Sequence, residues 1–263
     1  MNERKDFYIG YIDDVSPATK KFLKRTVLIL ALVILTTAAI FSLSQQPFAN
    51  STFELSNETK ISGVYHKSPY PMLRVEVEKG VYKNILLLGF GKFGANMYID
   101  ALKAKEGTLI NRRLTIEGNL IYYNGKTLLQ ITNEQKITLE PERSSSKTDL
   151  ASVVGDFELE GEVVDPKCYF GVMKPGKGKI HRSCASLCIA GGMPPVLVTT
   201  DSNNISEYFL LTDLKGQPIH SDILPYIGQP SKLNGTVEKL EDWYVMKIDV
   251  SNIEKLNKNS EIY

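Results

Sequence analysis

The three cysteines of this chain lie close together in the sequence, with one of its three histidines between them. Cys168, His181, Cys184 and Cys188 all fall within 21 positions. Thiolate and imidazole groups are the ligands that soft and borderline metal ions prefer, and four such groups complete a tetrahedral shell. We therefore predict a metal site at these four residues, with zinc or copper as the ion.

The spacing of these residues is compatible with a common site. Residues 181–190 favour a helix, which the two glycines at 191–192 would end. On a helix, positions i, i+3 and i+7 share a face, so the histidine and the last two cysteines point in the same direction. Cys168 can reach them across residues 174–179, whose glycines and proline permit a chain reversal.

A disulfide is the competing interpretation of the same residues. Cys168 could pair with Cys184 or Cys188, which would leave His181 at the surface and one thiol buried. Thiols outside the cytoplasm tend to pair, but three cysteines cannot all pair within one chain. A metal-handling or thiol-redox site at Cys184 and Cys188 is a further interpretation, and the sequence leaves these alternatives open.

An apolar stretch near the N-terminus predicts a transmembrane helix at residues 26–44. These 19 positions carry no charge, proline or glycine, and a helix of about 20 residues spans a bilayer core. Four basic residues precede the stretch directly and none follows until Lys60, which predicts a cytoplasmic N-terminus and periplasmic domains. The alternative is a cleaved signal peptide, but 25 residues before the apolar run are long for one.

The exported part contains two similar halves. Each half opens with a strand that carries a glycine and closes with two strands in which a glycine precedes a final isoleucine. These positions are Gly63, Gly118 and Ile131 in the first half, and Gly161, Gly235 and Ile248 in the second. Alternating apolar and polar residues indicate short strands. The pattern resembles the five-stranded oligonucleotide/oligosaccharide-binding (OB) barrel, with one long β-sandwich as the alternative.

These observations predict a mainly β protein with one transmembrane helix and two tandem OB-like barrels, the second with an inserted Cys/His loop and short helix. The expected parts are a cytoplasmic tail (1–25), a transmembrane helix (26–44), a stalk (45–59), a first barrel (60–140), a linker (141–154), a second barrel (155–253) and a C-terminal tail (254–263).

Several functions are disfavoured. The charge is nearly balanced, with 31 basic and 30 acidic residues, so we expect no nucleic-acid partner despite the barrel type. Residues 89–94 match the dinucleotide fingerprint G-x-G-x-x-G, but the region is too small for a doubly wound sheet. We expect these glycines to form a tight strand-to-helix corner and to bind no dinucleotide. His66 and His220 have no nucleophile nearby, so we expect both to be solvated and predict no catalytic residue.

The cysteine segment resembles a signature of exported bacterial OB-like domains whose function is poorly defined. The shared form is Cys…His-x-x-Cys-Ala-x-x-Cys-Ile-x-Gly-Gly-x-Pro, and this chain matches it from Cys168 to Pro194. The resemblance covers residues 155–253. It implies the second barrel and the place of the site within it, and it implies no activity.

We expect a membrane-anchored periplasmic accessory or assembly protein of an envelope complex, with a structural zinc, copper or disulfide site and no enzymatic activity. Its partners would be the lipid bilayer, through residues 26–44, and a membrane or periplasmic protein. The alternatives are a metal-handling or thiol-redox protein and, with less support, a barrel that binds a glycan or a peptide.

Overall fold

The computed structural model describes residues 16–44, 51–143 and 151–256. Parts of the predicted cytoplasmic tail (1–15), stalk (45–50), linker (144–150) and C-terminal tail (257–263) lie outside the described residues. The chain divides into two units, Met1–Ala49 and Asn50–Tyr263.

The first unit contains one long helix, α1 (Pro17–Ser44). It includes the predicted residues 26–44 and begins nine positions earlier, so that the basic residues before the apolar run are helical as well. Ser16 precedes the helix and its hydroxyl accepts a hydrogen bond from the Thr19 amide (3.3 Å), as an N-terminal cap does. The helix is long and apolar enough to cross a bilayer, and none of its residues is buried. It is compatible with a single-pass anchor.

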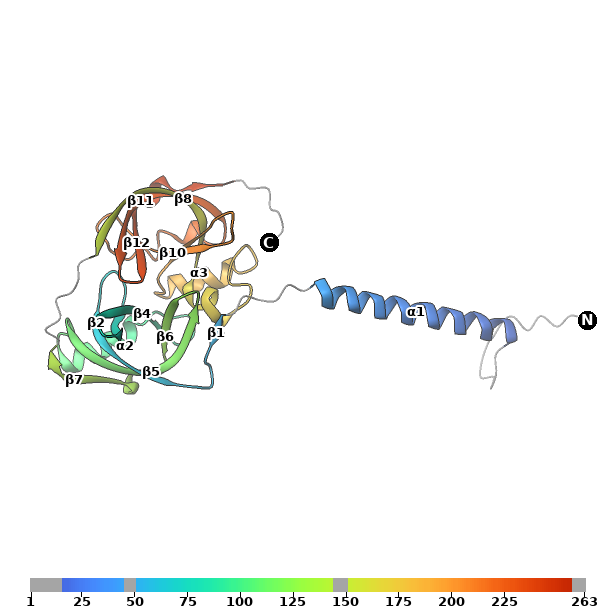
Figure 1. The fold of residues 1–263 in the computed structure, drawn as a ribbon, viewed down its shortest axis with the longest axis horizontal. Helices are drawn as coiled ribbons and strands as arrows, with labels where there is room; N and C mark the ends of the chain where they lie inside the picture. Colours follow the sequence, from blue (N-terminus) through green and yellow to red (C-terminus); the bar gives the residue numbers. More distant parts are fainter. Residues whose placement is uncertain (1–15, 45–50, 144–150, 257–263) are drawn as a thin grey trace, which may run out of the picture. The chain divides into compact units, whose positions relative to one another are not determined.

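The second unit consists of two closed five-stranded barrels in tandem (Figure 1). The first barrel is built from β2 (Thr59–His66), β3 (Met72–Glu78), β4 (Val81–Gly89), β5 (Arg112–Tyr123) and β6 (Lys126–Ile131). Two further strands, β1 (Thr52–Phe53) and β7 (Ile137–Arg143), pair with β5. Helix α2 (Asn96–Glu106) connects β4 to β5, and the 3-10 turn η1 (Glu134–Lys136) precedes β7.

The second barrel repeats this arrangement. Its strands are β8 (Ser152–Val164), β9 (Val196–Thr200), β10 (Ser206–Thr212), β11 (Pro230–Leu240) and β12 (Trp243–Ile248), with β13 (Glu254–Lys255) added to β11. The shorter elements are a π-helical turn η2 (Cys168–Val172), helix α3 (Arg182–Ala190), and the 3-10 turns η3 (Leu224–Tyr226) and η4 (Val250–Asn252).

Strand order is the same in both barrels. The closed order is β2-β3-β4-β6-β5 in the first and β8-β9-β10-β12-β11 in the second. In the first barrel β4 and β6 are parallel, and in the second β10 and β12 are parallel. All other neighbouring strands in the two barrels are antiparallel. The predicted fold class, two tandem OB-like barrels with a Cys/His insertion in the second, is confirmed.

The repeated glycines have a common physical cause. Gly118 pairs with Ile131 and Gly235 pairs with Ile248, at equivalent places in the two barrels. A Cβ atom would lie 2.3 Å from a backbone oxygen of the neighbouring strand at Gly118 and 2.2 Å from one at Gly235. Only glycine permits the close strand approach that a narrow barrel needs at these points.

Each barrel has its own apolar core, and a third core lies between them. This junction core combines side chains from both barrels, namely Tyr70, Met72, Leu86, Leu88, Ile121 and Leu128 from the first, and Val164, Phe170, Val196, Val198, Tyr208, Leu210, Trp243 and Val245 from the second. Trp243 is fully buried there and its indole donates to the Asn84 carbonyl at 2.9 Å. The barrels therefore form one compact unit.

The junction core predicts that the two barrels unfold together. Trp243→Ala should lower the free energy of unfolding by about 3–5 kcal/mol, because it removes a large buried side chain and leaves a cavity. Phe157→Ala is the matched control: Phe157 is 41% exposed, and its loss should cost less than about 1 kcal/mol. Denaturant unfolding of the full chain in detergent, followed by circular dichroism, measures both. Two separate transitions, of which only one responds to Trp243→Ala, would contradict the shared core.

Candidate metal centre

The cysteine segment is an insertion between the first two strands of the second barrel. Residues 67–71 join these strands in the first barrel, whereas residues 165–195 join β8 to β9 in the second. Figure 1 shows α3, in yellow, between the two sets of strands. The insertion therefore occupies the junction between the barrels.

Burial of one face orients helix α3. Ala185 and Ile189 pack into the core of the second barrel. This contact turns Cys188 inward, where it is 2% exposed, and leaves Cys184 half-buried at the helix edge. The helix ends at the predicted glycines, where the Gly191 amide donates to the Leu187 carbonyl at 3.0 Å.

The three cysteine sulfurs converge. The Sγ atoms of Cys168, Cys184 and Cys188 all lie within 4.8 Å of one another, and all three thiols are free. Two sulfurs that are each about 2.3 Å from one ion are about 3.8 Å apart in a tetrahedral shell. Closing around an ion therefore requires side-chain shifts of about 1 Å or less. The cluster could hold a metal ion.

His181 takes a different position. It forms a second potential ligand group with Asp165 and Cys168, and its Nε2 lies 3.0 Å from Asp165 Oδ2. Both side chains are almost completely buried. The other carboxylate oxygen, Asp165 Oδ1, accepts a hydrogen bond from the Cys168 amide at 2.9 Å. The Asp165–His181 pair thus holds the backbone of Cys168 in place. The four-ligand shell of three cysteines and His181 stays a prediction.

A hydrogen bond between two of the cysteines shifts their pKa values in opposite directions. The hydrogen bond between the Cys168 and Cys188 thiols, reinforced by burial, raises the pKa of Cys168. The same bond lowers the pKa of Cys188. Cys188 is therefore the first of the two to become a thiolate, the form that binds metals and attacks electrophiles.

Two lysines bring positive charge to the cluster. Lys92 Nζ lies 3.2 Å from Cys184 Sγ, and this hydrogen bond raises the pKa of Lys92. Lys167 is buried and its ammonium donates to the carbonyls of Gly89 (2.9 Å) and Gly91 (2.8 Å). Burial lowers the pKa of Lys167 to about 8. Both ammonium groups offset the negative charge that thiolates place at the site.

The glycine motif at 89–94 brings the first barrel to the cysteines. It turns the chain from β4 into α2, and its Gly94 amide donates to the Gly191 carbonyl at 2.9 Å. A Cβ atom on Gly94 would lie 2.1 Å from Gly192 O, and one on Gly191 would lie 2.0 Å from Lys92 O. The motif therefore makes a backbone-to-backbone contact beside the site.

Sequence reasoning missed three of the residues around the cluster. Lys92 and Lys167 are described above, and the third is Met173, whose Sδ lies 4.0 Å from Cys184 Sγ. The position of Lys92 within the glycine motif at 89–94 could have indicated a functional role. Nothing in the sequence distinguishes Met173 from the other methionines.

The prediction that His66 and His220 are solvated is wrong. Both are partly buried, and desolvation lowers the pKa of each. His66 ends β2 beside the junction, where Arg74 is near, and His220 Nδ1 lies 3.1 Å from the Met193 carbonyl oxygen.

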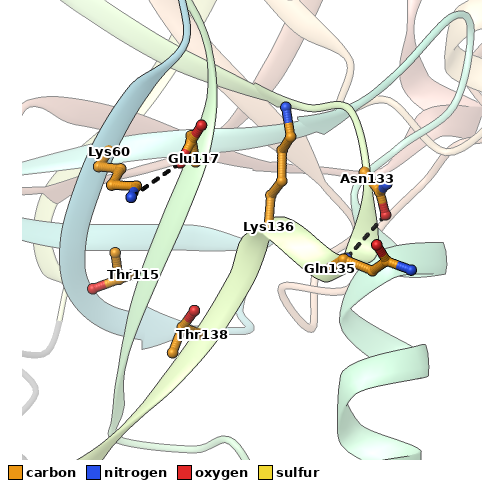
Figure 2. A pocket seen from close by; sticks show the side chains of 7 residues that line it. All are labelled: Lys60, Thr115, Glu117, Asn133, Gln135, Lys136 and Thr138. Carbon is orange, nitrogen blue, oxygen red and sulfur yellow. Dashed lines mark hydrogen bonds and ion pairs between the residues drawn. The ribbon is translucent and has the colours of Figure 1, made fainter.

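A hollow on the first barrel offers a weaker candidate. It has a volume of about 580 Å³ and is lined by Lys60, Thr115, Glu117, Asn133, Gln135, Lys136 and Thr138 (Figure 2). Lys60 pairs with Glu117 at 3.3 Å, and Lys136 pairs with Glu58. Since these charges already satisfy one another, the hollow gives no specific reason to bind a ligand.

Comparisons with protein-family models, with curated proteins and with solved structures found no match to this chain.

The burial of the three cysteines predicts the order in which they react. Cys184 should be alkylated first by iodoacetamide, because it is half-buried whereas Cys168 and Cys188 are 4% and 2% exposed. Cys168 should be the slowest, since its thiol is both buried and the hydrogen-bond donor to Cys188. Mass spectrometry of peptides from the folded chain measures the three rates. Unfolding in guanidinium is the control and should make them nearly equal. Equal rates in the folded chain would contradict the geometry.

Proposed function

We propose that this chain is a membrane-anchored accessory protein of the bacterial envelope that binds one thiophilic metal ion, zinc or copper. The observation that carries the proposal is the convergence of three cysteine sulfurs within 4.8 Å. The apolar helix α1 supports the anchor, and the basic residues before its apolar part support periplasmic placement of the barrels.

Partial exposure favours exchange of the ion over permanent storage. Cys184 is half-buried, and a metal bound to it would be within reach of an incoming ligand. Large apolar side chains next to Lys92 and Cys184 in the sequence are exposed: Phe90 and Phe93 lie on either side of Lys92, and Leu187 follows Cys184 by one turn of α3. Exposed apolar groups beside a metal site suit contact with a protein that delivers or receives the ion.

A structural ion is the second candidate, and the position of the site at the barrel junction favours it. The first barrel contacts the site through the Lys92–Cys184 hydrogen bond and the Gly94–Gly191 backbone bond. An ion held there would add stability to the junction that is lost when the ion is removed.

Metal analysis tests the proposal directly. The full chain, purified in detergent under reducing conditions, should bind one equivalent of Zn²⁺ or Cu⁺ with all three thiols protected from alkylation. Cys188→Ser should weaken binding by at least about 100-fold, because it removes the central thiolate. Ser183→Ala, an exposed change on the same helix, should leave binding unchanged. Three reactive thiols in the metal-treated chain would overturn the proposal.

Chelator treatment separates the two candidates. If the protein handles the ion, chelation should remove it while the circular dichroism spectrum and the unfolding midpoint change little. If the ion is structural, chelation should lower the midpoint markedly. Loss of two thiols without bound metal in the oxidised chain would instead support a thiol-redox role.

A further inference from the structure

We propose that Met173 is the fourth ligand of the site and that the bound ion is copper(I), held by four sulfur atoms. This inference rests on the metal-binding function proposed above and names its ion and its complete ligand set.

The position of Met173 supports this role. Its thioether sulfur lies 4.0 Å from Cys184 Sγ, so a fourth sulfur adjoins the outermost of the three thiols. The backbone ties it to another ligand, because the Met173 amide donates to the Cys168 carbonyl at 3.3 Å. The side chain is 48% exposed and has three rotatable bonds, so it can swing its sulfur toward an ion without disturbing the core.

His181 is less suited to the fourth position. Its Nε2 already lies 3.0 Å from Asp165 Oδ2, and Asp165 is completely buried. Because Nε2 faces Asp165, only Nδ1 could face an ion, and the imidazole groups with Cys168 alone among the three cysteines. In our account the Asp165–His181 pair instead holds Cys168, through the hydrogen bond from its amide.

The ligand chemistry selects the ion. Three thiolates and one thioether form a soft, all-sulfur set, which is the kind that copper(I) prefers. Zinc is held in proteins by cysteine, histidine and carboxylate groups. A methionine ligand therefore distinguishes copper(I) from zinc, whereas a histidine in the same position would suit either.

The four sulfurs differ in exposure, and this difference determines the side from which the ion can leave the site. Cys168 and Cys188 are buried, while Cys184 is half-buried and Met173 is exposed. An ion can leave by releasing the weakly bound thioether first and Cys184 next, while the two inner thiolates hold it. Transfer to a partner then proceeds by ligand exchange, with no change in the oxidation state of copper and with protons returning to the released thiolates.

Copper(I) titration tests the assignment. The full chain in detergent is titrated without oxygen against the copper(I) chelator bathocuproine disulfonate, and separately with Zn²⁺. Met173→Leu should weaken copper(I) binding by about tenfold or more and change zinc binding by less than about twofold. Met97→Leu is the matched control, since Met97 is similarly exposed at 55% and lies on α2. It should alter neither affinity.

X-ray absorption at the copper edge provides the second readout. The wild-type chain should show four sulfur neighbours and no nitrogen, and Met173→Leu should show three. A nitrogen neighbour in the wild type, or equal copper(I) affinity in Met173→Leu, would overturn the assignment. Binding of zinc without copper(I) would overturn it as well, yet leave the proposed metal-binding function intact. Failure of the wild type to bind either ion would overturn both.

Discussion

The close contact between the Gly89–Gly94 loop and the glycine end of α3 holds the site together. Backbone meets backbone there, with Gly94 N donating to Gly191 O at 2.9 Å and no room for a Cβ atom on either glycine. The buried ammonium of Lys167 secures the same loop through two carbonyl oxygens. Because of this contact, Lys92 of the first barrel reaches a cysteine of the second.

Packing around that contact determines what each cysteine can do. Ala185 and Ile189 anchor α3 in the second barrel, so Cys188 faces inward and Cys184 lies at the edge. Cys168 approaches from η2, where its amide is held by Asp165. The result is a pair of inner sulfurs, Cys168 and Cys188, behind the more accessible sulfur of Cys184, with the positive charges of Lys92 and Lys167 nearby. Such a gradient of exposure suits an ion that must be held firmly and also released.

The sequence predicted the fold and the cysteine cluster better than it predicted the surroundings of the cluster. Repeated glycines such as Gly118 and Gly235 indicated two similar barrels, because two strands that approach closely require glycine at the position where a Cβ atom would collide. Cys184 and Cys188 could also be placed together from the sequence, because residues four positions apart lie on the same face of a helix. Lys92 is 92 positions from Cys184, and only docking of the barrels brings them into contact. His181 has helical spacing too, yet the buried carboxylate of Asp165, 16 positions earlier in the chain, holds its Nε2.

The central claim is that three thiolates bind one ion at the barrel junction, and cobalt(II) substitution tests it most directly. Thiolate-to-cobalt charge transfer absorbs in the near ultraviolet, with an intensity that rises with the number of sulfur ligands. The account predicts one equivalent of cobalt with three thiolate bonds, and a stepwise loss of this absorption when cysteines at 168, 184 and 188 are replaced in turn by serine. A full titration without any sulfur charge-transfer band would contradict it.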